Sequence, residues 1–109
     1  MSDAARSLIL DPAHAKLVSP ASYWEIAIKI SLGKYVLTKP YAEAMHEAID
    51  SNGFGYLHIE PSHTAALATL PYHHRDPFDR LIIAQALTEQ IVIVGADPQF
   101  DTYGVTRYW

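Results

Sequence analysis

Apolar residues recur along the chain at two spacings, one typical of helices and the other typical of strands. The helical spacing predicts helices over residues 3–10, 22–32, 40–51, 61–70 and 76–87. Short apolar runs at residues 17–19, 56–59, 91–94 and 105–109 predict strands between and after them. The run 91–94 is entirely β-branched, as expected of a parallel strand that is buried on both faces.

Capping residues mark several of the predicted helix starts. Ser2 and Asp3 precede the first apolar positions, and Ser22 and Glu25 have the spacing of a capping box. Asp76 is followed by a proline, which combines a good N-cap with a residue suited to the first helical turn. These signals favour well-defined helices that begin close to polar side chains.

The order of the elements predicts the fold class. Strands that alternate with helices are typical of an α/β fold, with a short parallel sheet that is flanked by helices. The chain has 109 residues and contains no internal repeat, low-complexity tract or linker. We therefore expect a single domain over residues 1–109.

Composition excludes several classes of protein. Half of the residues are apolar and 18% are charged, which argues against disorder. The chain has no cysteine, so it has neither disulfides nor a cysteine-ligated zinc, which suits a reducing cytoplasm. No apolar run could span a bilayer and no signal peptide is evident. We expect a cytoplasmic protein without a membrane partner.

The formal net charge of −4 argues against a protein that coats nucleic acid through bulk charge. This net charge is compatible with an enzyme that contacts nucleic acid only at a local site. Arg75 and Arg80 flank an acidic segment, with His73 and His74 beside them, so positive charge is available there.

Three carboxylates lie where α/β sheets usually place a site, near the ends of strands and the starts of the following helices. Glu25 comes soon after the predicted strand 17–19, Asp97 soon after 91–94, and Asp79 in the first turn of the helix that Asp76 opens. Mg²⁺ prefers oxygen ligands and needs only one or two carboxylates besides phosphate oxygens. Such a site could polarise a phosphodiester.

Each of these residues also has a purely structural interpretation. Glu25 could complete the capping box with Ser22 or pair with Lys29 one turn later. Asp79 could interact favourably with the positive end of the helix dipole, and Asp76 could act only as the N-cap. Asp97, which precedes a proline, could be an ordinary turn residue. Adjacent His73 and His74 could bind a transition metal with Asp76, although a solvated loop or a phosphate-contacting patch fits their spacing better.

Three phrases taken together distinguish between these interpretations. The segments "SPASYWEIAIKISLGK", "LPYHHRDPFDRLIIAQAL" and "IVIVGADPQFDTYGV" resemble, in order, the PIN-domain family and in particular the VapC-like toxins of type II toxin–antitoxin pairs. The middle phrase is the most specific. The resemblance implies a Mg²⁺- or Mn²⁺-dependent endoribonuclease that acts on RNA, an antitoxin that blocks its pocket, and a homodimer.

By this resemblance Glu25, Asp79 and Asp97 match the family's catalytic, metal-binding carboxylates. Asp76 matches a common companion, and we expect Asp76, Arg75 and Arg80 to lie in the outer shell or on the substrate side. Two departures affect the expectation. The family's first strand, which is central in the sheet and ends in a metal-ligating Asp, precedes the matched segments, so we expect a truncated PIN-like domain that lacks both. Gly95 and Ala96 replace the family's Thr and Arg before the last Asp.

Three hypotheses follow. The first is a metal-dependent ribonuclease of the toxin type whose activity is weakened or abolished by the truncation. The second is a non-catalytic PIN remnant that dimerises or binds an antitoxin. The third, which the sequence supports least, is a transition-metal hydrolase centred on His73, His74 and Asp76.

Overall fold

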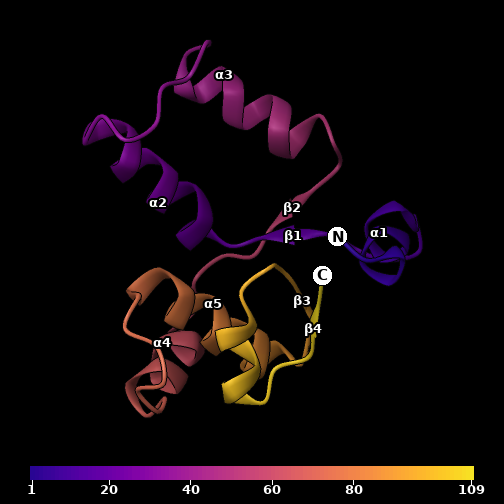
Figure 1. Ribbon diagram of the computed structural model, residues 1–109, viewed down its shortest axis with the longest axis vertical. Helices are drawn as coiled ribbons and strands as arrows, with labels where there is room; N and C mark the ends of the chain where they lie inside the picture. The colour runs from indigo at the N-terminus through magenta and orange to yellow at the C-terminus, as the bar shows by residue number, and fades with distance from the viewer. The chain divides into compact units, whose positions relative to one another are not determined.

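The computed structural model describes residues 1–109. The chain divides into two units, which are described separately (Figure 1). The first unit comprises residues 1–14 and 59–109, and the second comprises residues 15–58. No helix is both long and apolar enough to cross a membrane.

The first unit combines helices with two short strands. Its N-terminal helix starts as predicted, because the Ser2 side chain accepts a hydrogen bond from the backbone of Ala5. Further along the chain, two helices are followed by a short strand and a 3₁₀ helix. The elements are α1 (Asp3–Leu10), α4 (Pro61–Ala68), α5 (Pro77–Glu89), β3 (Ile93–Val94), the 3₁₀ helix η2 (Pro98–Tyr103) and β4 (Arg107–Tyr108).

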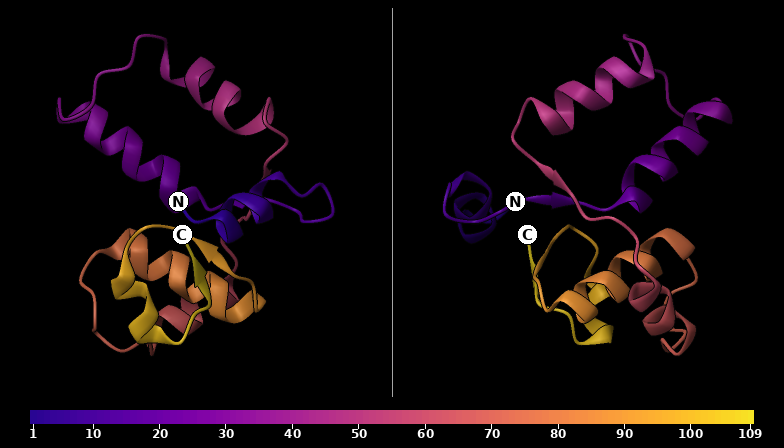
Figure 2. Two further views of the ribbon diagram at one scale, coloured as in Figure 1. Left: turned by 45° about the vertical axis from the view of Figure 1, so that its right-hand side comes forward. Right: turned by 180° about the vertical axis from the view of Figure 1, so that it is seen from behind.

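The core of the first unit forms around α5. Figure 2 shows α4 and the yellow C-terminal segment packed against this helix in both views. Ile83 and Ala84 on α5 are completely buried, and Phe100 of η2 is 7% exposed. Because side chains from a helix, a strand and a 3₁₀ helix share this core, their termini are held in fixed positions around it. The buried cluster consists of Leu70, Ile83, Ala86, Ile93 and Phe100.

The two strands of the first unit pair in parallel, with Ile93 opposite Arg107 and Val94 opposite Tyr108. The prediction that residues 91–94 are buried on both faces is wrong. Only Ile93 is buried, whereas Ile91, Val92 and Val94 are 38–46% exposed. The β-branched run therefore forms a two-residue strand in a two-stranded ladder, where its outward side chains remain accessible.

The second unit contains a second parallel ladder and its own helices. Tyr41 links two of the helices, because its hydroxyl donates a hydrogen bond to the carbonyl of Tyr23 at 2.9 Å. Burial of this hydroxyl raises the pKa of Tyr41. The elements are β1 (Leu17–Val18), α2 (Pro20–Ser31), α3 (Tyr41–Met45), the π-helix η1 (His46–Asp50) and β2 (Gly55–Tyr56).

The predicted capping box at Ser22 and Glu25 is wrong. Helix α2 begins three residues earlier, where Ser19 is the N-cap and accepts a hydrogen bond from the backbone of Ala21 at 3.2 Å. Pro20 at the first helical position favours this start, because proline is suited to the first turn. Ser22 and Glu25 consequently lie inside the helix rather than at its cap.

The α/β class is confirmed, since helices alternate with short strands that pair only in parallel. The prediction of one sheet differs from the structure. Strands β1 and β2 form one ladder and β3 and β4 form another. Each strand has only two residues, so each ladder consists of only two pairs of opposite residues.

Candidate metal centre

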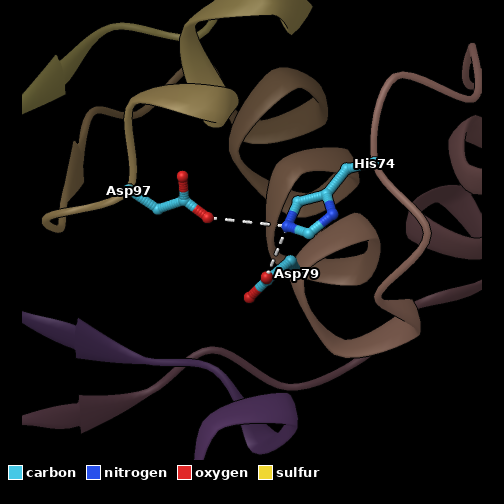
Figure 3. Close-up of side chains that lie close together, drawn as sticks. All are labelled: His74, Asp79 and Asp97. Carbon is cyan, nitrogen blue, oxygen red and sulfur yellow. Dashed lines mark ion pairs between the residues drawn. The ribbon is translucent and has the colours of Figure 1, made fainter.

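Three side chains of the first unit converge at one place. Figure 3 shows one nitrogen of the His74 ring facing the carboxylates of both Asp79 and Asp97. Each residue offers one possible ligand atom, and these atoms lie within 4.8 Å of one another. His74 comes from the loop before α5, Asp79 from the first turn of α5, and Asp97 from the turn after β3.

The helix cap positions Asp79. The Asp76 carboxylate accepts hydrogen bonds from the backbone N–H groups of Phe78 at 2.8 Å and of Asp79 at 3.1 Å. These bonds fix the first turn of α5, so the Asp79 side chain projects from the positive end of the helix dipole. The Asp79 side chain is 24% exposed, which leaves it partly open to solvent.

A turn and an ion pair position Asp97. One carboxylate oxygen of Asp97 accepts the backbone N–H of Gln99 at 2.9 Å and so caps η2. Beside it, the Arg107 guanidinium donates to the carbonyl of Gly95 at 3.0 Å and to both carboxylate oxygens of Asp101. This pairing lowers the pKa of Asp101, and together with the nearby Asp97 it raises the pKa of Arg107.

His74 lies between these two carboxylates. Its Nε2 atom is 2.9 Å from Oδ2 of Asp79 and 3.5 Å from Oδ2 of Asp97. The His74 side chain is 18% exposed, and Nε2 itself is buried without a hydrogen bond of good geometry. Nε2 of His74 and Oδ2 of Asp79 are therefore close enough for a hydrogen bond, but their relative direction does not suit one.

The second unit holds Glu25. Its carboxylate lies 3.6 Å from the ammonium group of Lys29 one helical turn later. This carboxylate is also the main reason that the pKa of Lys29 is raised. The predicted convergence is thus found for Asp79 and Asp97, and for Glu25 it stays a prediction.

The expected outer-shell residues have distinct surroundings. Asp76 acts as the N-cap described above, and Arg75 is exposed. Arg80 is buried, and its guanidinium donates to the carbonyls of Leu70 and Pro71 while it stacks on the ring of Tyr72. Its charged group is therefore held by the protein's own carbonyls, and a substrate-side role for Arg80 has no support from this geometry.

Only one member of the expected His73, His74 and Asp76 set lies in the cluster. The ring of His73 packs edge-on against Tyr103, and the Asp76 carboxylate caps α5. The interpretation of His74 as part of a solvated loop is wrong, because its ring is mostly buried. The sequence contains one indication that His74 lies near the site. His74 precedes the N-cap residue Asp76 by two positions and is therefore close to the start of α5.

The donor set fits a divalent cation. Two carboxylates supply oxygen ligands of the kind that Mg²⁺ and Mn²⁺ prefer. Asp79 and Asp97 would hold such an ion.

Comparison with known proteins identifies the family. The PIN domain family matches residues 1–105, almost the whole chain. No curated protein and no solved structure matches the chain significantly. PIN domains are generally nucleases and usually use a divalent metal, which agrees with a carboxylate cluster at the start of a helix and the end of a strand. On this match over residues 1–105, the chain belongs to the PIN domain family.

Proposed function

We propose that the protein is a metal-dependent endoribonuclease of the VapC-like toxin type, which hydrolyses phosphodiester bonds of RNA. Its metal, Mg²⁺ or Mn²⁺, is held by Asp79 and Asp97 with Glu25 as the third carboxylate. The observation that carries this proposal is the convergence of Asp79 and Asp97 within 4.8 Å in a chain of a nuclease family.

The bound ion supplies Lewis-acid polarisation of the phosphodiester. Other residues of this chain hold the two metal-binding carboxylates in position. The cap formed by Asp76 fixes the backbone of Asp79, and the contacts of Arg107 fix the turn that precedes Asp97. A preorganised pair of carboxylates is important because small errors in ligand position weaken catalysis strongly.

We further propose that residues 1–109 act as one PIN-like domain in the cytoplasm, as a homodimer and with a cognate antitoxin as partner. Exposed apolar side chains in the second unit support an interaction surface. Val36 is 90% exposed, Leu32 64% and Trp24 55%. Association would remove this apolar area from water, which is the main favourable term in most protein interfaces.

Metal binding is the first test. Purified protein should melt at a higher temperature when Mn²⁺ or Mg²⁺ is added, because a ligand at about 100 times its Kd stabilises the folded state by about 2.7 kcal/mol. Asp79→Asn and Asp97→Asn should each abolish this stabilisation. Glu43→Gln, which changes an exposed carboxylate in the first turn of α3, is the matched control and should respond like the parent protein.

Activity is the second test. The protein should cleave a mixed RNA pool in the presence of Mg²⁺ or Mn²⁺ and should stop when a chelator is added. Asp79→Asn should be inactive and Glu43→Gln active. Cleavage that persists in Asp79→Asn with chelator would reveal a contaminating nuclease or another mechanism. A folded protein that binds neither ion would instead favour the non-catalytic alternative, a PIN remnant that dimerises or binds an antitoxin.

A further inference from the structure

His74 carries a hydrogen-bonding pattern that restricts what its ring can do. The backbone N–H of Arg75 donates to Nδ1 of His74 at 3.0 Å. A backbone N–H can only donate, so Nδ1 must present its lone pair. In the neutral ring the single proton then lies on Nε2, the atom that faces Asp79 and Asp97.

This tautomer argues against His74 as a metal ligand. A ligating imidazole binds the metal through the lone pair of one nitrogen and donates the N–H of the other nitrogen to an acceptor. In His74 the nitrogen remote from the carboxylates already accepts a hydrogen bond. Ligation through Nε2 would therefore require either loss of the Arg75 contact or a ring without any N–H proton.

The position of Nε2 suits a hydrogen-bond donor. It lies 2.9 Å from Oδ2 of Asp79, which is hydrogen-bonding distance, and its hydrogen-bonding capacity is otherwise unused. Reorientation of the carboxylate or of the ring would align the N–H with this oxygen. Phe100, which is buried, contacts the ring edge-on with its centroid 6.4 Å away and limits larger movements of the imidazole.

We propose that His74 is a positioning residue of the metal centre. Its Nε2–H donates to Asp79 and fixes the direction of that carboxylate toward the ion, and His74 itself does not bind the ion. The proposal rests on the proposed function, because it assigns a role relative to a metal held by Asp79 and Asp97. Donors of this kind, which orient a ligand from outside, typically change metal affinity by about 10–100-fold when they are removed.

The test uses the full chain labelled with ¹⁵N at its six histidines. At about pH 8, where a free imidazole is neutral, side-chain NMR distinguishes the two tautomers. The His74 signal, which is assigned by its loss in His74→Gln, should show a proton on Nε2 and none on Nδ1. This pattern should persist when Mg²⁺ is added.

Variants supply the second measurement, the Mg²⁺ affinity. His74→Ala should bind Mg²⁺ about tenfold or more weakly. His74→Gln should recover most of the affinity, because its amide N–H can reach the place of Nε2–H. The neighbouring His73→Ala, whose ring lies against Tyr103, is the matched control and should bind normally.

The outcomes separate the two proposals. A proton on Nδ1, loss of the Nε2 proton when Mg²⁺ binds, or normal affinity in His74→Ala would overturn the role of His74 and leave the proposed function intact. Absence of Mg²⁺ binding by the parent protein would overturn both. The NMR measurement on the parent protein decides the tautomer even if a variant fails to fold.

Discussion

The hydroxyl of Tyr103 accepts a hydrogen bond from the backbone N–H of His74 at 2.7 Å. Tyr103 ends η2, the 3₁₀ helix that Asp97 caps, whereas His74 lies in the loop before α5. The same hydroxyl contacts the carbonyl of His74 at 3.5 Å and the buried guanidinium of Arg80 at 3.4 Å. This side chain therefore connects the segments that carry Asp97 and His74.

Replacing this hydroxyl should weaken both the fold and the site. Tyr103→Phe keeps the ring but leaves the partly buried N–H of His74 without its partner, so the free energy of unfolding should fall by about 1–3 kcal/mol. Urea unfolding measures this change, and Mg²⁺ affinity should fall with it. Tyr72→Phe, at an exposed ring that stacks on Arg80, is the control and should leave both quantities unchanged. Equal effects of the two variants would contradict the role of the Tyr103 hydroxyl.

The ion pair of Asp101 and Arg107 predicts a pH-dependent term in stability. Because Arg107 lowers the pKa of Asp101 below its ordinary 3.8, the pair stabilises the fold above about pH 3.8, and the effect is lost as the pH falls through the lower folded value. Asp101→Asn should be less stable than the parent near neutral pH. The difference should shrink at acid pH, where the protonated Asp101 carboxyl of the parent is uncharged like the asparagine amide of the variant. Urea midpoints across the pH range measure it, and a constant difference would contradict the prediction.

Asp76 should matter for stability through its capping bonds. Asp76→Ala removes the acceptor of the Phe78 and Asp79 backbone N–H groups and should cost about 1 kcal/mol of stability. Asp76→Ser retains a capping oxygen and should recover most of the loss. If Asp76→Ser restores stability but not metal binding, the carboxylate has the outer-shell role expected from the sequence. Thermal melting with and without Mg²⁺ separates the two contributions.

Gln90 is the one non-glycine residue with a positive φ, at 56°, and it forms the C-cap of α5. A non-glycine residue costs roughly 1–2 kcal/mol in this left-handed conformation. Glycine avoids this cost, but it loses more conformational freedom when the chain folds. Gln90→Gly should therefore stabilise the protein by a net of about 0.5–1 kcal/mol. Thr88→Gly, at an exposed position in the last turn of the same helix, should destabilise by about 0.3 kcal/mol, because threonine is already a weaker helix former than alanine. Chemical denaturation of both variants checks the opposite signs.

Much of the fold could be predicted from local signals. Asp76 with Pro77 and Ser2 with Asp3 each gave a helix start that the structure confirms, because a cap depends on neighbouring residues only. The start of α2 was missed because two serines in the same segment satisfy capping rules, and the earlier one, Ser19, precedes a proline. The exposure of Ile91, Val92 and Val94 was missed because it depends on which strands pair, and local composition does not contain that information.

The candidate site was only partly predictable. Asp79 and Asp97 were candidates from their places at a helix start and after a strand, and the resemblance to the PIN-domain family selected them. The structure brings these two residues together. The role of His74 could not be derived, because it depends on a backbone contact with Arg75 and on side-chain packing against Phe100. Arg80 was expected in the outer shell or on the substrate side, and its burial against backbone carbonyls could not be derived, because it depends on long-range packing.

Glu25 offers a direct test of the third ligand. If its carboxylate binds the ion, Glu25→Gln should weaken Mg²⁺ binding strongly, whereas Lys29→Met should retain or tighten binding, because it removes a competing cation and leaves the carboxylate in place. If Glu25 serves only to pair with Lys29, the two variants should have similarly small effects on stability and none on Mg²⁺ affinity. Calorimetric titration of both variants with Mg²⁺ distinguishes these cases. Unchanged affinity in Glu25→Gln would remove Glu25 from the site and leave Asp79 and Asp97 as its carboxylates.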